Sequence, residues 1–146
     1  MEDCLVYFFT GFLDSGKTTT IGEWATNEAF RGRKIVILST EEGDVEYDDI
    51  EFTDGQPVII EKEYSEINRD LMFSIEAEHK PDVLFIEWNG SVSPSKFFDE
   101  VDVPERWALA AAVVVIDATT YSEYYKNMQT FFADYYRYCD TAVFNR

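Results

Sequence analysis

Residues 11–18 read Gly11-Phe12-Leu13-Asp14-Ser15-Gly16-Lys17-Thr18. They fit the pattern G-x-x-x-x-G-K-S/T at every fixed position, which is the pattern of a phosphate-binding loop. Glycines let the backbone wrap closely round an anion, so that successive N–H groups point at the phosphate oxygens. A helix that begins directly after the loop adds the partial positive charge of its N-terminus. The stretch therefore predicts a strand, a phosphate loop and a helix in succession.

The residue types inside this loop predict individual roles. Lys17 supplies a full positive charge for the β- and γ-phosphates and is the first candidate catalytic residue, and the Thr18 hydroxyl is a candidate Mg2+ ligand. Asp14 is unusual, because a carboxylate in a phosphate cradle is unfavourable; we predict that it faces solvent, with a role in orienting the attacking water as the alternative. The predicted nucleotide-binding set in this region is Gly11, Leu13, Asp14, Ser15, Gly16, Lys17, Thr18 and Thr19.

The rest of the chain alternates short apolar runs with longer amphipathic stretches. We predict strands at 4–9, 34–39, 58–60, 82–87, 110–116 and 141–145, and helices at 18–30, 65–79 and 121–139. Near-continuous apolar strands separated by helices are typical of a parallel sheet that is covered on both faces. The predicted fold class is α/β, a P-loop NTPase fold whose mainly parallel β-sheet has helices on both faces.

Length, charge and cysteine content narrow the function classes. The chain has 146 residues, 29 acidic and 12 basic, for a net charge of -17. Because a surface with this much negative charge repels phosphate backbones and anionic lipid, we expect neither nucleic acid nor a membrane as partner. Two distant cysteines predict no disulfide framework, and the N-terminus lacks a basic signal region, so we expect a cytoplasmic protein. We expect one domain over 1–146, the N-terminal part of a longer protein, because the sequence ends on a predicted strand.

Acidic residues follow several of the predicted strands, where a magnesium site needs them. Glu87 ends an apolar strand and opens Glu-Trp-Asn-Gly, a glutamate version of the D-x-x-G switch, in which Gly90 lets a backbone N–H reach the γ-phosphate. Glu87 is therefore the second candidate catalytic residue and a candidate metal ligand. Glu41 is a further candidate metal ligand after the second strand, with a plain acidic turn as an equal alternative. Asp117 ends a later strand.

Taken in order, these motifs resemble the N-terminal GTPase domain of the CobW-like family, within the SIMIBI class of P-loop GTPases. The chain's T-G-F-L and G-K-T-T are similar to the family's T-G-F-L-x-x-G-K-T-T, and its T-E-E-G-D-V to N-E-F-G-E-V. Its E-W-N-G resembles E-T-S-G, and V-V-V-I-D-A resembles V-V-V-D-A. Asn145 falls where the family begins its N-K-x-D guanine motif and is a candidate base-binding residue. The resemblance covers nearly the whole chain.

The resemblance implies a GTPase that serves metal delivery or metalloenzyme or cofactor assembly. With magnesium at the loop residues, we expect its turnover alone to be slow, because no arginine stands in the motifs. The implied partners are a nucleoside triphosphate, a metalloenzyme client and a C-terminal domain. Two features depart from the family. No cysteine stands near residues 60–65, where its C-x-C-C metal motif is expected, and Arg146 replaces the guanine-motif lysine. Glu61, Glu63 and Glu66 offer hard oxygen ligands there, but a solvated helix start is the preferred interpretation.

Two other function classes share the phosphate loop. An ATP-dependent small-molecule kinase would need an arginine-rich lid, and only Arg31 and Arg33 lie close together, in a short predicted turn. A non-hydrolysing, nucleotide-dependent interaction module would fit the missing cysteines and the incomplete guanine motif. A preference for ATP would favour the kinase, and an absence of phosphate release with any divalent metal would favour the module.

Overall fold

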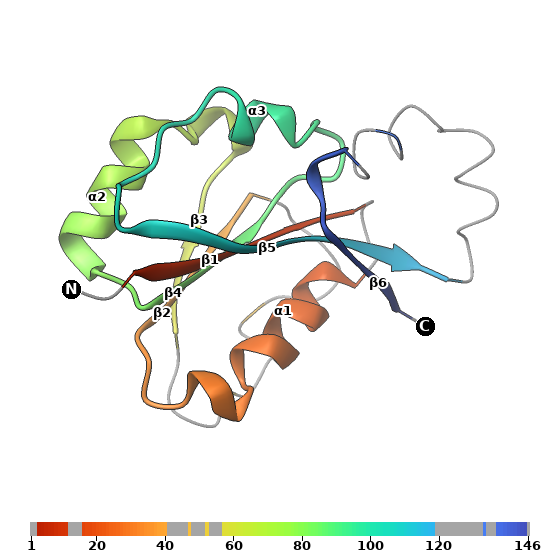
Figure 1. Cartoon of the computed structure of the whole chain (residues 1–146), viewed down its shortest axis with the longest axis horizontal. Coiled ribbons are helices and arrows are strands. Elements are labelled where there is room, and N and C mark those ends of the chain that lie inside the picture. The colour runs from red at the N-terminus through yellow and green to blue at the C-terminus, as the bar shows by residue number, and fades with distance from the viewer. Residues whose placement is uncertain are drawn as a thin grey trace.

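In the part of the chain that the structure describes, six strands form one sheet in the order β3-β2-β4-β1-β5-β6, and every neighbouring pair is parallel (Figure 1). This computed structural model describes residues 3–11, 16–40, 47, 52, 57–118, 133 and 137–145. The strands are β1 Cys4–Thr10, β2 Ile35–Ser39, β3 Val58–Glu61, β4 Val83–Glu87, β5 Trp107–Asp117 and β6 Thr141–Asn145. All six expected strands are present, which confirms the strand pattern.

Helices cover both faces of the sheet, as the sequence predicts. Helix α1 (Lys17–Ala25) packs its Ile21 on one face, against side chains of β1, β2 and β4. Helices α2 (Arg69–His79) and α3 (Ser95–Phe98) lie on the opposite face, where Met72 and Phe97 join a second core cluster (Figure 1). Every residue of β4 is buried, since this strand has a neighbour on each side and a layer on each face. The predicted α/β fold class is confirmed.

The predicted helix boundaries are less accurate than the strands. Helix α1 ends at Ala25 instead of continuing to Phe30, because the Asn27 side chain accepts a hydrogen bond from Ala29 N and opens a separate 3-10 turn, Glu28–Phe30. Helix α2 starts at Arg69 and not at residue 65, because Asn68 caps it by accepting from Leu71 N at 2.9 Å. A 3-10 turn, Tyr64–Glu66, precedes this cap.

Two further expectations and one unexpected helix remain to be compared with the structure. Strand β5 begins at Trp107, earlier than expected, because its first residues pair with β1 from Cys4 onward. Helix α3 was not expected from the sequence. The helix predicted over 121–139 lies mostly outside the described residues.

The cysteines are packing residues in the part of the chain that the structure describes. Cys4 is buried in the core and Cys139 is half-buried, and burial raises the pKa of both thiols to about 12. Thiols with so high a pKa stay protonated and are poor nucleophiles.

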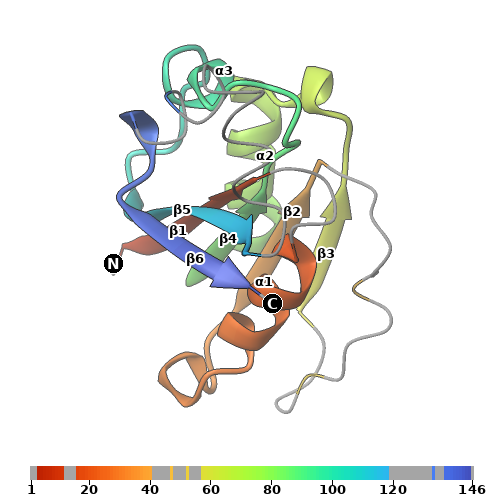
Figure 2. The same cartoon turned by 90° about the vertical axis from the view of Figure 1, so that its right-hand side faces the viewer.

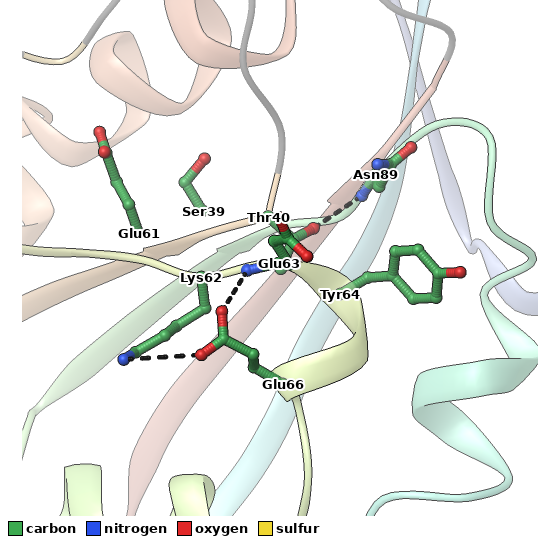
Figure 3. A pocket seen from close by; sticks show the side chains of 8 residues that line it. All are labelled: Ser39, Thr40, Glu61, Lys62, Glu63, Tyr64, Glu66 and Asn89. Atoms are coloured by element: carbon green, nitrogen blue, oxygen red, sulfur yellow. Dashed lines mark hydrogen bonds and ion pairs between the residues drawn. The ribbon is translucent and has the colours of Figure 1, made fainter.

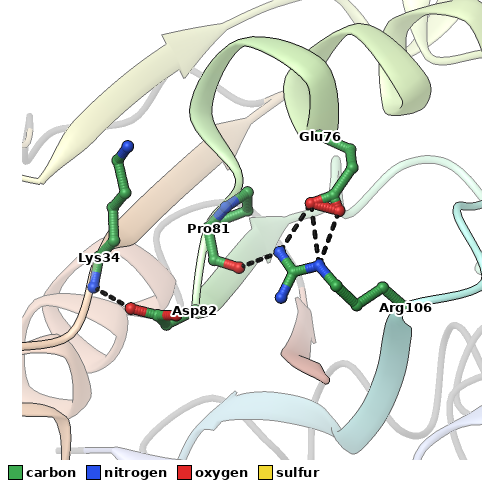
Figure 4. Close-up of polar contacts among 5 residues, drawn as sticks. All are labelled: Lys34, Glu76, Pro81, Asp82 and Arg106. Atoms are coloured by element: carbon green, nitrogen blue, oxygen red, sulfur yellow. Dashed lines mark hydrogen bonds and ion pairs between the residues drawn. The ribbon is translucent and has the colours of Figure 1, made fainter. Parts of the chain in front are cut away.

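At the amino end of the sheet, Glu76 of α2 forms an ion pair with Arg106, the residue before β5 (Figure 4). Arg106 donates through Nε to both carboxylate oxygens of Glu76 and through Nη2 to Oε1, the last at 2.6 Å. The same Nη2 donates to the Pro81 carbonyl oxygen at 2.6 Å, just before β4. Nearby, the Lys34 amide donates to Asp82 Oδ2 at 2.9 Å and ties the approach to β2 to that of β4. The candidate functional site lies at the opposite, carboxyl end of the sheet.

No helix in the described part of the chain has both the length and the apolar composition needed to span a bilayer.

Candidate functional site

The site lies where the carboxyl ends of β1, β2 and β4 meet the start of α1. Gly11 follows β1 with φ 141° and Gly16 precedes α1 with φ 99°, in the left-handed region that favours glycine. These two glycines let the chain leave the sheet and enter the helix within a short loop. The C-terminal end of β6 lies on the same side of the molecule as the first turn of α1 (Figure 2).

Lys17 is buried at the first position of α1, with 3% of its surface exposed. Its Nζ donates to the Gly11 carbonyl oxygen at 2.6 Å, so the ammonium group lies beside the residue that follows β1. A buried ammonium group is unfavourable unless it has acceptors. The Gly11 carbonyl oxygen is such an acceptor, and it holds the Lys17 side chain close to the carboxyl end of β1.

Glu87 is the centre of a buried cluster of hydroxyl groups. It ends β4 with 2% of its surface exposed. Thr18 Oγ1 donates to its Oε2 at 2.7 Å, while Ser39 Oγ and the Tyr47 hydroxyl both donate to its Oε1 at 2.9 Å. The β2–β4 register places Ser39 beside Glu87, and α1 supplies Thr18. The carboxylate therefore connects α1, β2 and Tyr47, which follows β2 in the chain.

The environment of Glu87 has opposing effects on its ionisation. Burial raises the pKa of the Glu87 carboxyl group, while the hydrogen bonds from Thr18, Ser39 and Tyr47 and the positive charge of Lys17 lower it. The raising effect is the larger. A carboxylate in such a place gains more from a bound cation than an exposed one does.

The backbone after Glu87 is fastened to both neighbouring strands. Thr40 donates to the Glu87 carbonyl oxygen through its amide at 2.9 Å and its hydroxyl at 3.0 Å, and the same hydroxyl accepts from Asn89 N at 2.9 Å. The Trp88 amide donates to Phe9 O at 2.7 Å. Gly90 follows in a turn and is buried. This bonding fixes the start of the Glu-Trp-Asn-Gly segment relative to β1 and β2.

Trp88 anchors the same segment on the α3 side of the sheet. Its indole packs against Phe8 and Phe97, with ring centroids 5.7 and 5.9 Å away. The indole N–H donates to the carbonyl oxygens of Val92 at 3.1 Å and Ser93 at 3.3 Å. The segment that carries Gly90 is thus held at both ends.

An open pocket of about 550 Å³ adjoins the cluster (Figure 3). Its lining residues come from the ends of β2 and β3, the turn after β3 and the segment after β4: Ser39, Thr40, Glu61, Lys62, Glu63, Tyr64, Glu66 and Asn89. Glu66 accepts from Glu63 N at 3.1 Å and lies 4.0 Å from Lys62 Nζ, whereas Glu61 points away from them (Figure 3). Among the described residues no three His, Cys, Asp or Glu side chains gather as a metal site.

The structure brings some of the predicted site residues together and leaves others untested. Lys17, Thr18 and Glu87 meet at the carboxyl end of the sheet with Gly11 and Gly16, and Gly90 lies on the attached segment. Thr19 is described and faces solvent. The predicted residues that lie outside the described part of the chain are Leu13, Asp14, Ser15 and Glu41, together with the side chain of Asn145.

Three residues of the cluster were missed in the sequence. A polar Ser39 at the end of an apolar strand, followed by Thr40, was a signal that could have been used, because parallel strand ends converge. Tyr47 gave no such signal, since it stands 40 residues from Glu87 and only the tertiary fold joins them.

Comparisons with known proteins bear on both the family and the fold. The family model described as CobW/HypB/UreG, nucleotide-binding domain, matches residues 5–146. Among solved structures, a Zn(II)-bound triple mutant of the YjiA GTPase matches with a TM-score of 0.67 and 23% sequence identity. All of this chain is covered but only 50% of that one, so the chain spans half the length of its structural neighbour. Among curated protein sequences, none shows significant similarity.

Proposed function

Because the chain belongs to the CobW/HypB/UreG family of nucleotide-binding domains, we propose that it binds GTP together with Mg2+ and hydrolyses the nucleotide slowly. The observation that carries this proposal is the buried cluster in which Lys17, Thr18 and Glu87 converge between α1 and β4. A nucleotide-binding domain needs a cation for the phosphates and oxygen ligands for the metal, and both stand at one end of the sheet.

The phosphates would be held by the loop that Gly11 and Gly16 delimit. Lys17 Nζ now donates to a loop carbonyl at 2.6 Å, and a β- or γ-phosphate oxygen would take over as its acceptor. The first backbone N–H groups of α1 have no partner within the helix, which makes them donors for an anion. The binding energy would therefore come from charge-assisted hydrogen bonds with a pre-formed geometry.

The donor set around Thr18 fits magnesium. Mg2+ prefers oxygen ligands and keeps several of its waters. The Thr18 hydroxyl is half-exposed and can ligate directly, whereas the Glu87 carboxylate can accept from metal-bound water at Oε2. Glu41 is a further proposed ligand from the sequence. When bound, the ion would neutralise charge that develops on the β- and γ-phosphate oxygens.

Hydrolysis would rest on positioning and charge stabilisation by this chain's own groups. Lys17 would stabilise charge on the phosphates, and the Gly90 N–H would contact the γ-phosphate from a segment that Thr40 and Trp88 hold in place. The motifs at 11–18, 40–45 and 87–90 contain no arginine, so turnover alone would be slow. Asn145, at the end of β6, would contact the guanine base.

The purpose of hydrolysis is the finer part of the proposal. We propose metal delivery or metalloenzyme assembly in the cytoplasm, with a client protein or a C-terminal domain as partner. The family membership and the Zn(II) bound to the YjiA GTPase mutant support this role. The absence of the family's cysteine motif from the sequence near 60–65 means that any cargo metal would be held by other residues.

Nucleotide binding with matched lysine variants tests the proposal. We expect GTP to bind more tightly than ATP in calorimetric titrations with Mg2+. Lys17→Ala should weaken GTP binding about a hundredfold, because it removes a charged hydrogen-bond donor from the phosphates. Lys34→Ala removes an exposed lysine from the other end of the sheet and should leave the GTP Kd unchanged.

The opposite results would identify the rival functions. Unchanged GTP affinity in Lys17→Ala would show that the site is misassigned. Tighter binding of ATP than of GTP would favour a kinase. Phosphate release that stays at background with every divalent metal would leave a binding module and not an enzyme.

A further inference from the structure

The cluster around Glu87 contains two donors that no recognised motif includes, Ser39 Oγ at the end of β2 and the phenol of Tyr47, and Tyr47 is the one that comes from outside the strands. Tyr47 lies between β2 and β3, only 4% exposed, and packs in the core cluster on the α1 face of the sheet. Its hydroxyl donates to Glu87 Oε1 at 2.9 Å. A phenylalanine would fill the same space, so the hydroxyl group must be explained separately from the packing.

The hydrogen bonds of Glu87 show what this hydroxyl does. Each oxygen of an ionised carboxylate offers about two acceptor positions. Oε1 accepts from Ser39 and Tyr47 and is therefore full, whereas Oε2 accepts from Thr18 alone among the described residues. The second acceptor position of Oε2, the oxygen that bonds to the candidate metal ligand, is thus the one left for metal-bound water.

We propose that Tyr47 is a positioning residue for the magnesium site, which fixes the carboxylate of Glu87 with Oε1 filled and Oε2 directed toward Thr18. The inference rests on the proposed function. Tyr47 touches neither the nucleotide nor the metal in this assignment and acts only through Glu87. With Ser39 as the single donor to Oε1, the carboxylate could turn about its last bond and lose its orientation toward Thr18. The hydrogen bond from Tyr47, the third donor to the carboxylate after Thr18 and Ser39, prevents this rotation.

A purely structural role explains the hydroxyl less well. Burying a hydroxyl is unfavourable unless it finds an acceptor, so it adds nothing to an apolar core that a phenylalanine would not. The acceptor that Tyr47 uses is a carboxylate whose charge is itself disfavoured by burial. The hydrogen bond from Tyr47 to Glu87 is therefore better explained by a site that requires this carboxylate to be charged and held in one orientation.

The Mg2+ dependence of GTP binding in Tyr47→Phe tests the proposal. The variant keeps the ring and removes only the hydroxyl. We expect the Mg2+ concentration that half-saturates the GTP complex to rise about tenfold, since the carboxylate that accepts from metal-bound water loses its fixed orientation. GTP affinity in EDTA should stay close to that of the parent protein, whereas the melting temperature should fall by a few degrees at most, because the hydrogen bond to Glu87 is present in the metal-free protein too. An unchanged Mg2+ midpoint, or an equal loss of affinity with and without Mg2+, would overturn the proposal.

Two further variants separate positioning from a general effect on the core. Tyr7 lies in the same core region and stacks on Phe85, and its hydroxyl makes no hydrogen bond with any described residue, so Tyr7→Phe is the matched control. Its Mg2+ midpoint should equal that of the parent. In a Glu87→Gln background, Tyr47→Phe should shift the midpoint much less than it does alone, because both act through one group. Additive effects would contradict the inference.

The same experiment distinguishes the two proposals. A parent protein that binds no GTP, or a Lys17→Ala variant that binds it equally well, overturns the proposed function and this inference together. A parent that passes both tests, with a Tyr47→Phe variant that behaves like the parent, overturns the positioning role alone.

Discussion

Each end of the sheet holds a glutamate that is mostly shielded from solvent, and the surroundings of the two glutamates shift their pKa values in opposite directions. At the amino end, Glu76 meets the guanidinium of Arg106, whose side-chain hydrogen bond lowers the pKa of the glutamate carboxyl group. At the carboxyl end, Glu87 meets three hydroxyl donors, and burial raises its pKa. One carboxylate is paired with a cation of the chain itself, while the other is hydrogen-bonded but keeps most of its charge uncompensated.

The difference separates a structural ion pair from a glutamate that is proposed to act in the functional site. The Glu76–Arg106 pair joins α2 to the approaches of β4 and β5, and its charges balance within the fold (Figure 4). Glu87 is buried without such balance, which reduces stability but leaves a negative site for an external cation. The chain has 12 basic residues against 29 acidic ones. At the carboxyl end of the sheet, Lys17 donates its hydrogen bond to the Gly11 carbonyl oxygen and not to Glu87.

Glu87→Gln is the change with the largest expected effect on function. The amide keeps the size of the side chain and removes the charge, so we expect Mg2+-dependent GTP hydrolysis to fall about a hundredfold or more. The free energy of unfolding without metal should not fall, because a disfavoured buried charge is removed. Phosphate release and urea unfolding in EDTA would measure the two quantities. A variant with full activity and lower stability would make Glu87 a structural residue like Glu76.

Arg106→Ala should show the reverse pattern at the other end of the sheet. It leaves Glu76 and the Pro81 carbonyl without their guanidinium partner, and we expect a loss of about 2 kcal/mol in the free energy of unfolding. GTP affinity should be unchanged. Lys96→Ala is a matched control, since Lys96 pairs with Glu100 at 3.5 Å but both side chains are more than half exposed, and such pairs contribute about 0.5 kcal/mol or less. Equal effects of the two substitutions would remove the contrast.

The pH dependence of stability should differ in sign between the two glutamates, and this is the smallest of the three effects. The pKa of Glu76 is below 4.5 in the folded protein, so its contribution is complete above pH 4.5 and is lost as pH falls through the folded pKa. The pKa of Glu87 is above 4.5 in the folded protein, so the folded state binds the carboxyl proton more tightly than the unfolded state does. The protein therefore loses stability as pH rises from about 4.5 through the folded pKa of Glu87.

Unfolding of three proteins in EDTA would measure these slopes. The difference in the free energy of unfolding between the parent and Arg106→Ala should shrink as pH falls below about 4.5. The free energy of unfolding of Glu87→Gln should increase relative to that of the parent as pH rises above about 4.5. Urea titrations between about pH 3 and pH 7 would cover both windows. Parallel curves for all three proteins would show that neither carboxyl group has a shifted pKa.

The sequence predicted the sheet better than the helices. Apolar runs such as 82–87 are long, β-branched and bounded by polar residues, so their strand character does not depend on distant contacts. Helix ends depend on single caps, and the prediction missed that Asn27 and Asn68 each redirect the chain. Of the candidate site, Lys17, Thr18 and Glu87 were found because a fixed motif or a strand end marks them.

The sequence by itself determined that a phosphate loop joins a strand to a helix and that acidic residues follow neighbouring strands, because the spacing of those residues is local. Only the tertiary structure decided which groups surround Glu87. The β2–β4 register brings Ser39 to one side of the carboxylate, α1 brings Thr18 to the other, and Tyr47 reaches it across 40 residues of sequence. Hydrogen bonds between strand ends and a distant segment depend on register and packing, and no pattern along the chain encodes them.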